Sequence, residues 1–307
     1  MEKTIRIGTR DSELALWQAH TVKDQLENLG YNTQLVPVKS TGDLILDKPL
    51  YEMGITGIFT RTLDVAMLAV KVDIAVHSMK DVPTKLPHGI VQAAVLKRAA
   101  TEDILVHKDD FDPAETLKQN VTIATGSLRR KAQWLHRYSH HEMTDLRGNV
   151  NTRLQKLKDS DWAGAIFAKA GLERINLKPE NHTVLDWMIP APAQGAMVIA
   201  ALETDEFSQE ACAKLNHKNS EITTQVERDF LRKLEGGCTA PIGALAEIVS
   251  DQIQFKGALF SLDGKTKYEV ARSVSVKEYE HFGERCAEEI LENGGQGLMQ
   301  EIKRALN

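Results

Sequence analysis

Residues 4–38, TIRIGTRDSELALWQAHTVKDQLENLGYNTQLVPV, decide the fold class of this 307-residue chain. Side chains alternate between apolar and polar over residues 4–8, which is typical of a β-strand. Ser12 can cap a following helix, whose apolar stripe includes Leu14 and Leu26 and stops at Gly30. Residues 34–38 favour a second strand, so the stretch predicts a strand–helix–strand unit.

The same alternation continues through the first two thirds of the chain. A helix over 57–70 precedes a strand over 73–77, and a similar series begins again with a strand at 121–125. In this second series, helices are expected from Ser127, from Asn149 and near Leu172, after strands at 121–125, 142–146 and 162–168. Such repetition predicts βαβ units and a mainly parallel sheet in each half.

Two segments, 96–101 and 189–195, are expected to cross between the halves, and residues 197–202 are expected to return as a strand to the first sheet. A helix over 221–234 follows. From Ile242 the pattern changes to three antiparallel strands and two terminal helices. We therefore predict an α/β fold, with two α/β domains (1–97 with 196–215, and 101–190) and a small α+β third domain (218–307).

Composition narrows the class of function. The net charge of −5 disfavours nucleic acid as the main partner, because phosphate binding needs a basic face. No stretch approaches the roughly 18 apolar residues of a membrane span, and the N-terminus has no secretory pattern. We expect a monomer in the cytoplasm that binds no membrane. Three widely spaced cysteines and scattered histidines predict neither disulfides nor a metal site.

Arginines follow several predicted strands at the start of the next helix. Examples are Arg10, the pair Arg129 and Arg130, Arg147 with Arg153 one helical turn on, and Arg174. The carboxyl ends of strands border the ligand site in open α/β sheets, and helix N-termini attract anions there. Arginine adds a fork that matches a carboxylate. The pattern predicts a small ligand with many carboxylates or phosphates, and the absence of a Gly-x-Gly-x-x-Gly turn disfavours a nucleotide.

Two residues that follow the third predicted strand add to this picture. Lys80 would contribute another cation, and Asp81 could stabilise a developing positive charge or transfer protons. Asp81 could equally be a turn residue ahead of Pro83, and His77 a buried core histidine.

Cys238 follows Gly236 and Gly237 on a predicted tight turn, where little bulk surrounds the sulfur. A thiol displayed in this way is suited to carrying a group covalently. A glycine-rich helix end with an incidental cysteine is the alternative. Cys212 and Cys286 lie in amphipathic helical stretches, where thiols are usually buried.

These segments together resemble the porphobilinogen deaminase (hydroxymethylbilane synthase) family of tetrapyrrole biosynthesis, nearly from end to end. The matching motifs are LALWQA (14–19), TGD (41–43) with ILD (45–47), HSMKDVP (77–83), GSLRR (126–130), LRGNV (146–150) with TRL (152–154), and EGGC (235–238) with PIG (241–243).

The resemblance implies two domains of the periplasmic-binding-protein type around a cleft, and a third domain with a dipyrromethane cofactor linked by a thioether to Cys238. Four porphobilinogen units would be added to this primer with loss of ammonia, and hydrolysis would release the linear hydroxymethylbilane. Asp81 would be the catalytic residue. Carboxylate binding is assigned to Arg10, Ser12, Lys80, Thr125, Ser127, Arg129, Arg130, Arg147, Gly148, Asn149, Arg153, Arg174 and Gln194.

The chain departs from the family pattern at three places: Thr56 replaces a lysine, Gly126 replaces a serine, and residues 99–103 replace an acidic Asp-Pro-Arg-Asp run. Two other classes of function are disfavoured. A non-catalytic two-lobed protein that binds carboxylates or other anions is disfavoured by the absence of an export signal and by the displayed thiol. An enzyme that uses the arginines for phosphate is disfavoured by the missing nucleotide loop.

Overall fold

The computed structural model describes residues 3–39, 60–108, 112–234 and 240–306. Its contacts divide the chain into two compact units. Among the described residues, unit 1 takes in 3–39, 60–99 and 195–222, and unit 2 takes in the remainder. Among the described residues, the chain passes between the units within the two predicted crossing segments and again between residues 222 and 223. None of the described helices is long and apolar enough to cross a membrane.

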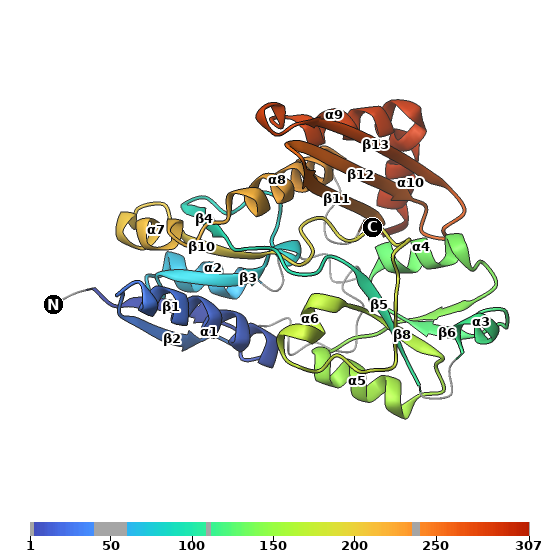
Figure 1. Cartoon of the computed structure of the whole chain (residues 1–307), viewed down its shortest axis with the longest axis horizontal. Coiled ribbons are helices and arrows are strands. Elements are labelled where there is room, and N and C mark those ends of the chain that lie inside the picture. Colours follow the sequence, from blue (N-terminus) through green and yellow to red (C-terminus); the bar gives the residue numbers. More distant parts are fainter. Residues whose placement is uncertain (1–2, 40–59, 109–111, 235–239, 307) are drawn as a thin grey trace. The chain divides into compact units, whose positions relative to one another are not determined.

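Unit 1 is built on a five-stranded sheet in the order β2-β1-β3-β10-β4 (Figure 1). Strand β10 runs antiparallel to both of its neighbours, whereas β1 is parallel to β2 and β3. The elements are β1 (Ile5–Thr9), α1 (Glu13–Asn28), β2 (Thr33–Pro37), α2 (Arg61–Leu68), β3 (Ile74–Ser78), a 3₁₀ turn (Met79–Asp81), β4 (Ile90–Val95), β10 (Met197–Leu202) and α7 (Glu206–Ala213).

Helices cover both faces of this sheet. The side chains of β3 alternate between the two faces and pack against helices on each. Ile74 and Val76 pack into a buried cluster that includes residues of α1 and α7. Ala75 points to the opposite face and packs with Leu63 and Met67 of α2. The near-continuous apolar sequence of β3 therefore reflects burial on both sides.

The first sheet of unit 2 repeats this topology in the order β7-β6-β8-β5-β9, with β5 as the antiparallel strand. In each sheet the antiparallel strand directly follows a crossing segment. The elements are β5 (Asp103–His107), α3 (Pro113–Thr116), β6 (Thr122–Ala124), α4 (Leu128–Arg137), β7 (Glu142–Thr144), α5 (Val150–Asp159), β8 (Gly164–Ala168), α6 (Lys169–Arg174) and β9 (His182–Val184).

Unit 2 also contains an antiparallel sheet in the order β11-β12-β13. Phe260 of β12 and Ala132 of α4 belong to one buried cluster, so α4 packs against the antiparallel sheet through apolar contacts. The elements are α8 (Lys218–Lys233), whose first turn belongs to unit 1, β11 (Ile242–Val249), β12 (Gln252–Phe260), β13 (Lys267–Ser275), a 3₁₀ turn (Val276–Glu278), α9 (Phe282–Ile290), a π-helical turn (Leu291–Gly295) and α10 (Gln296–Leu306).

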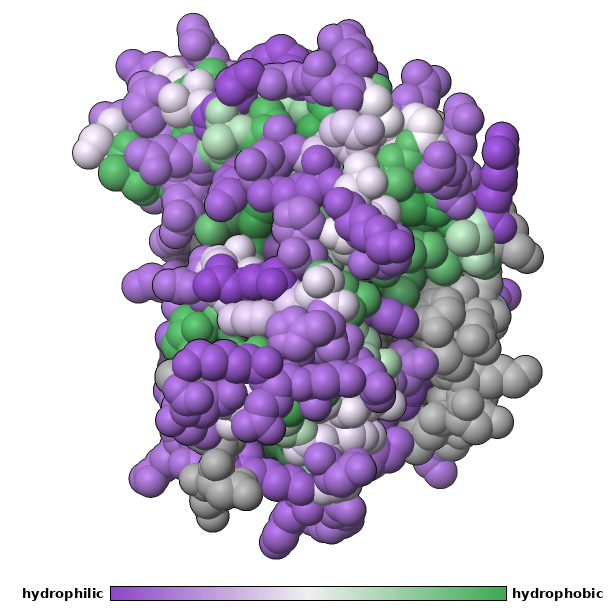
Figure 2. Space-filling model, turned by 90° about the vertical axis from the view of Figure 1, so that its right-hand side faces the viewer, coloured by the Kyte–Doolittle hydropathy of each residue, from purple (hydrophilic) through white to green (hydrophobic). Residues whose placement is uncertain are grey.

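The expected α/β class is confirmed, with a third, smaller sheet of antiparallel strands. The predicted return of residues 197–202 to the first sheet is also confirmed. Strands β4, β5 and β9 were not predicted. The face shown in Figure 2 is mainly hydrophilic, with several apolar patches among the polar side chains.

Candidate active site

In unit 1, four predicted site residues lie beyond the carboxyl ends of two neighbouring parallel strands. Arg10 and Ser12 follow β1, and Lys80 and Asp81 follow β3. Ser12 is the N-cap residue of α1, but its side chain makes no capping hydrogen bond. Its hydroxyl and the first N–H groups of α1 are thus compatible with binding an anion.

The turn that carries Asp81 is anchored at its start. The buried Gln18 of α1 donates its side-chain Nε2 to Ser78 Oγ at 2.8 Å, and Met79 N donates to Ala196 O at 3.0 Å. Asp81 closes the 3₁₀ turn and remains partly exposed. The sheet and α1 therefore fix the backbone, while the carboxylate stays accessible.

His77 is buried directly before this turn, and its Nε2 has no hydrogen-bond partner among the described residues. Burial, with a smaller contribution from the charge of Arg10, lowers the pKa of His77 to about 4. The imidazole is therefore neutral near pH 7, which agrees with the interpretation of His77 as a core histidine.

In unit 2, the predicted residues other than Gln194 follow three adjacent parallel strands, β6, β7 and β8. Ser127 caps α4 by accepting a hydrogen bond from Arg130 N at 3.4 Å. Asn149 caps α5 by accepting from Thr152 N at 2.9 Å. The N-termini of α4 and α5 thus lie at the same edge of the sheet as Thr125, which is itself buried.

Backbone geometry at this edge depends on two glycines. Gly148 has φ +117°, a conformation that other residues rarely adopt, and its carbonyl accepts a hydrogen bond from Arg153 Nε at 2.7 Å. A Cβ on Gly126 would lie 2.5 Å from the carbonyl oxygen of Leu146. The glycine at position 126, where the family pattern has a serine, therefore coincides with a close approach between the loops after β6 and β7.

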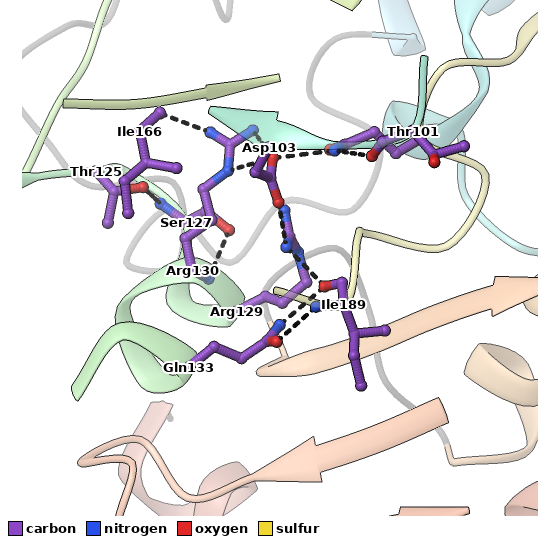
Figure 3. A network of polar contacts seen from close by, with 10 residues as sticks. Thr101, Asp103, Thr125, Ser127, Arg129, Arg130, Gln133, Ile166 and Ile189 are labelled. Atoms are coloured by element: carbon purple, nitrogen blue, oxygen red, sulfur yellow. Dashed lines mark hydrogen bonds and ion pairs between the residues drawn. The ribbon is translucent and has the colours of Figure 1, made fainter. Parts of the chain in front are cut away.

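Arg129 and Arg130 are almost fully buried and share one carboxylate, that of Asp103 (Figure 3). Arg129 Nη1 donates to Asp103 Oδ2 at 2.6 Å, while Arg130 donates Nε at 3.0 Å and Nη2 at 2.7 Å to Oδ1. The backbone carbonyls of Ile189 and Ile166 accept further bonds from Arg129 and Arg130 respectively. Both guanidinium groups are thus held in fixed positions within unit 2.

This cluster contains two cations and one anion. Burial lowers the pKa of Arg129, and the charged described residues that act on it are Asp103 and Arg130. Arg129 Nε is buried and has no hydrogen-bond partner among the described residues. A buried excess of one positive charge with an unused donor suits a bound anion such as a carboxylate.

The other predicted arginines of unit 2 are also partly or largely buried. Burial lowers the pKa of Arg174 to about 10, and it lowers the pKa of Arg147, with Asp145 acting in the opposite direction. Gln194 is fully buried and donates its Nε2 to Thr101 O at 2.7 Å and to Asp103 Oδ1 at 2.9 Å. Gln194 therefore joins the arginine cluster through Asp103.

Two of the three cysteines lie in the described part of the chain, and both are buried. Burial raises the pKa of Cys212 and that of Cys286 to about 12. Neither thiol is therefore suited to carrying a cofactor. Cys238 lies outside the described residues, as does Thr56.

Among the described residues, no group of three His, Cys, Asp or Glu side chains is placed to bind a metal ion. A cavity of about 290 Å³ in unit 1 lies between α2 and the segment 83–87, and none of the predicted site residues lines it. The residue that sequence reasoning missed is Asp103. In the sequence it is the last position of the run 99–103, which departs from the family pattern, although an acidic residue at the start of a buried strand requires a cationic partner.

Comparison with known proteins identifies two matching family models. Residues 5–210 match "Porphobilinogen deaminase, dipyromethane cofactor binding domain", and residues 222–292 match "Porphobilinogen deaminase, C-terminal domain". A porphobilinogen deaminase of Desulfitobacterium hafniense is 40% identical over 307 residues, covering 99% of each chain. One of Syntrophomonas wolfei is 37% identical over 306 residues, covering 98% of this chain and all of that protein.

Solved structures that match part of the chain include solute-binding proteins. An ancestral cationic amino acid solute-binding protein matches with a TM-score of 0.43 and 14% identity, over 69% of this chain and 87% of that one. The extracellular-binding protein ytmK of Bacillus subtilis matches with a TM-score of 0.42 and 14% identity, over 76% and 97%.

Proposed function

Because the chain belongs to the porphobilinogen deaminase family, we propose that it is a hydroxymethylbilane synthase, a transferase that joins four porphobilinogen molecules head to tail. In each step a C–N bond of the substrate's aminomethyl group breaks and ammonia leaves. A C–C bond then forms to the free α-carbon of the acceptor pyrrole, which loses a proton. Water finally releases the linear tetrapyrrole.

The observation that supports this proposal most strongly is the buried cationic cluster of Asp103, Arg129 and Arg130 within a chain of net charge −5. Porphobilinogen carries an acetate and a propionate group, so its oligomers are polycarboxylates. Arg147, Arg153 and Arg174 follow the neighbouring strands and would bind further carboxylates. The other residues proposed to bind carboxylates are Arg10, Ser12, Lys80, Thr125, Ser127, Gly148, Asn149 and Gln194.

The family's dipyrromethane cofactor would supply the pyrrole carbon to which the first substrate molecule is joined. The described residues fit this group, because the cluster has an excess positive charge and an unused buried donor on Arg129. We propose Cys238 as the point of attachment. The high pKa values of Cys212 and Cys286 support this choice by removing the other two thiols.

Asp81 is proposed as the catalytic residue. Its carboxylate is partly exposed on a turn that Gln18 and Ala196 hold in place. A fixed carboxylate at this position would stabilise positive charge on the pyrrole nitrogen as the C–C bond forms and would accept the proton that is lost. Lys80, the preceding residue, and Arg10, which follows the neighbouring strand β1, would bind substrate carboxylates.

The molecular organisation proposed with this function follows the sequence expectations. The three domains are 1–97 with 196–215, 101–190 and 218–307. The enzyme is expected to act as a cytoplasmic monomer that binds neither nucleic acid nor membrane.

The substitution Asp81→Asn tests the mechanism, since it removes the charge and keeps the size of the side chain. We expect the purified variant to keep the cofactor mass, because Asp81 lies outside the arginine cluster, and to lose turnover by at least about 100-fold, the scale of general acid–base catalysis. Lys85→Met, in the cavity beside the same segment, is the matched control and should keep its turnover. A near-normal rate in Asp81→Asn would remove Asp81 from the mechanism.

A further inference from the structure

Asp103 is not among the residues proposed to bind the ligand, although it contacts two of them. Its side chain is fully buried, and it is the first residue of β5. The sheet fixes its backbone, because Asp103 pairs with Ala168 of β8 and its carbonyl accepts a hydrogen bond from Leu185 N at 2.9 Å. A carboxylate on so rigid a support can orient the groups that bind to it.

The two oxygens of Asp103 divide the arginine pair between them. Oδ2 accepts from Arg129, whereas Oδ1 accepts two bonds from Arg130 and one from Gln194 (Figure 3). The same Gln194 nitrogen also binds Thr101 O. One carboxylate therefore restrains both guanidinium groups. Through Gln194 it also restrains Thr101, so it holds the two points at which the chain enters and leaves this part of unit 2.

The cluster around Asp103 has a different ratio of cations to anions from an ordinary structural ion pair. Arg6 and Asp73 in unit 1 form such a pair, with one cation, one anion and two side-chain hydrogen bonds at 3.0 and 2.7 Å. At Asp103, two buried cations share one carboxylate, and Arg129 Nε remains without a partner among the described residues. An arrangement serving stability alone would gain nothing from this excess charge.

We infer that Asp103 is a positioning residue that orients Arg129 and Arg130 and cancels one of their two charges, so that the pair accepts a single carboxylate group of the bound pyrrole chain. This inference rests on the proposed function. Asp103 does not touch the ligand in this scheme. It sets the direction of the donors and limits the charge that the ligand must neutralise.

The test compares the full-length loaded protein with its Asp103→Asn and Asp103→Glu variants, with Asp73→Asn as the matched control. Three quantities are measured: the fraction of molecules that carry the cofactor mass, kcat and KM, and the unfolding midpoint in sodium propionate against sodium chloride at equal ionic strength. Asp103→Asn leaves an uncompensated charge, so we expect a lower cofactor fraction, turnover reduced about 100-fold, and an unfolding midpoint that propionate raises.

Asp103→Glu keeps the charge but displaces it by one methylene group. We expect turnover to fall here as well, without a response to propionate. Asp73→Asn should lose stability but keep its cofactor fraction, and propionate should not restore its midpoint, because Arg6 is 33% exposed and water can solvate it.

Normal cofactor content and turnover in Asp103→Asn would overturn the inference, as would an equal propionate response in Asp73→Asn. If Asp103→Asn does not fold, the double variant Asp103→Asn/Arg129→Met restores a single excess charge and should fold; its failure would show that Asp103 serves folding alone. Absence of the cofactor mass from the wild-type protein would instead refute the proposed function.

Discussion

Replacing Arg130 by methionine tests whether the arginine cluster is held in place by its ionic contacts. The change removes two hydrogen bonds to Asp103 and one to the carbonyl of Ile166. Removing one partner of a buried pair costs about 3–5 kcal/mol. The lower end applies here, because Arg129 still contacts Asp103 and the cluster becomes neutral. We expect a loss of about 3 kcal/mol in the free energy of unfolding of unit 2, or roughly 6–12 °C in its Tm.

Tryptophan fluorescence during urea denaturation is a suitable assay, since three of the four tryptophans (Trp134, Trp162 and Trp187) lie in unit 2 and Trp134 is fully buried. Arg272→Met is the matched control in the same unit. Its guanidinium group is 56% exposed and pairs with Glu289, so its loss should change stability by no more than about 0.5 kcal/mol. Equal denaturation midpoints in the two variants would refute the reasoning.

Three further predictions concern His77, Gly126 and the two cap serines. Because the folded protein protonates His77 only near pH 4 and the unfolded chain near 6.5, the unfolded state binds more protons between these values; stability should fall as pH drops through this window, by as much as about 3 kcal/mol, and urea titrations of His77→Gln should show a smaller loss. Gly126→Ala should cost about 1–3 kcal/mol in thermal unfolding, because its Cβ would meet the Leu146 carbonyl, and wild-type stability would contradict this contact. Ser127→Ala should destabilise α4 by about 0.5–1 kcal/mol, whereas Ser12→Ala, which loses no cap bond, should leave stability unchanged and raise KM for porphobilinogen; the reverse pattern would exclude Ser12 from binding.

The main architecture was predictable because local sequence patterns coincide with the tertiary structure. The apolar stripe of α1 and the cap residues Ser127 and Asn149 predicted helices that the structure contains. The positions of arginines after strands likewise predicted their arrangement along one sheet edge. Each of these features depends on residues close together in the chain.

Other features depend on contacts between distant segments and were missed for that reason. Strand β5 is identified by its pairing with β8 and β9, which lie far along the chain. The sharing of Asp103 by Arg129 and Arg130 spans more than 25 residues, and Gln194 joins it from 91 residues away. Sequence patterns predicted that the arginines lie close to a ligand site, but they could not predict that a buried carboxylate holds two of them.

The central claim is that Cys238 carries the primer of a hydroxymethylbilane synthase, and thiol accessibility measured by mass spectrometry tests it most directly. Treated with an alkylating reagent in its native state at pH 8, the protein should leave Cys212 and Cys286 unmodified, because burial raises the pKa of each thiol to about 12. After denaturation, we predict that these two thiols alone are alkylated, and that the dipyrromethane mass is found on the peptide containing Cys238. Alkylation of all three cysteines in an active protein without added mass would contradict the account.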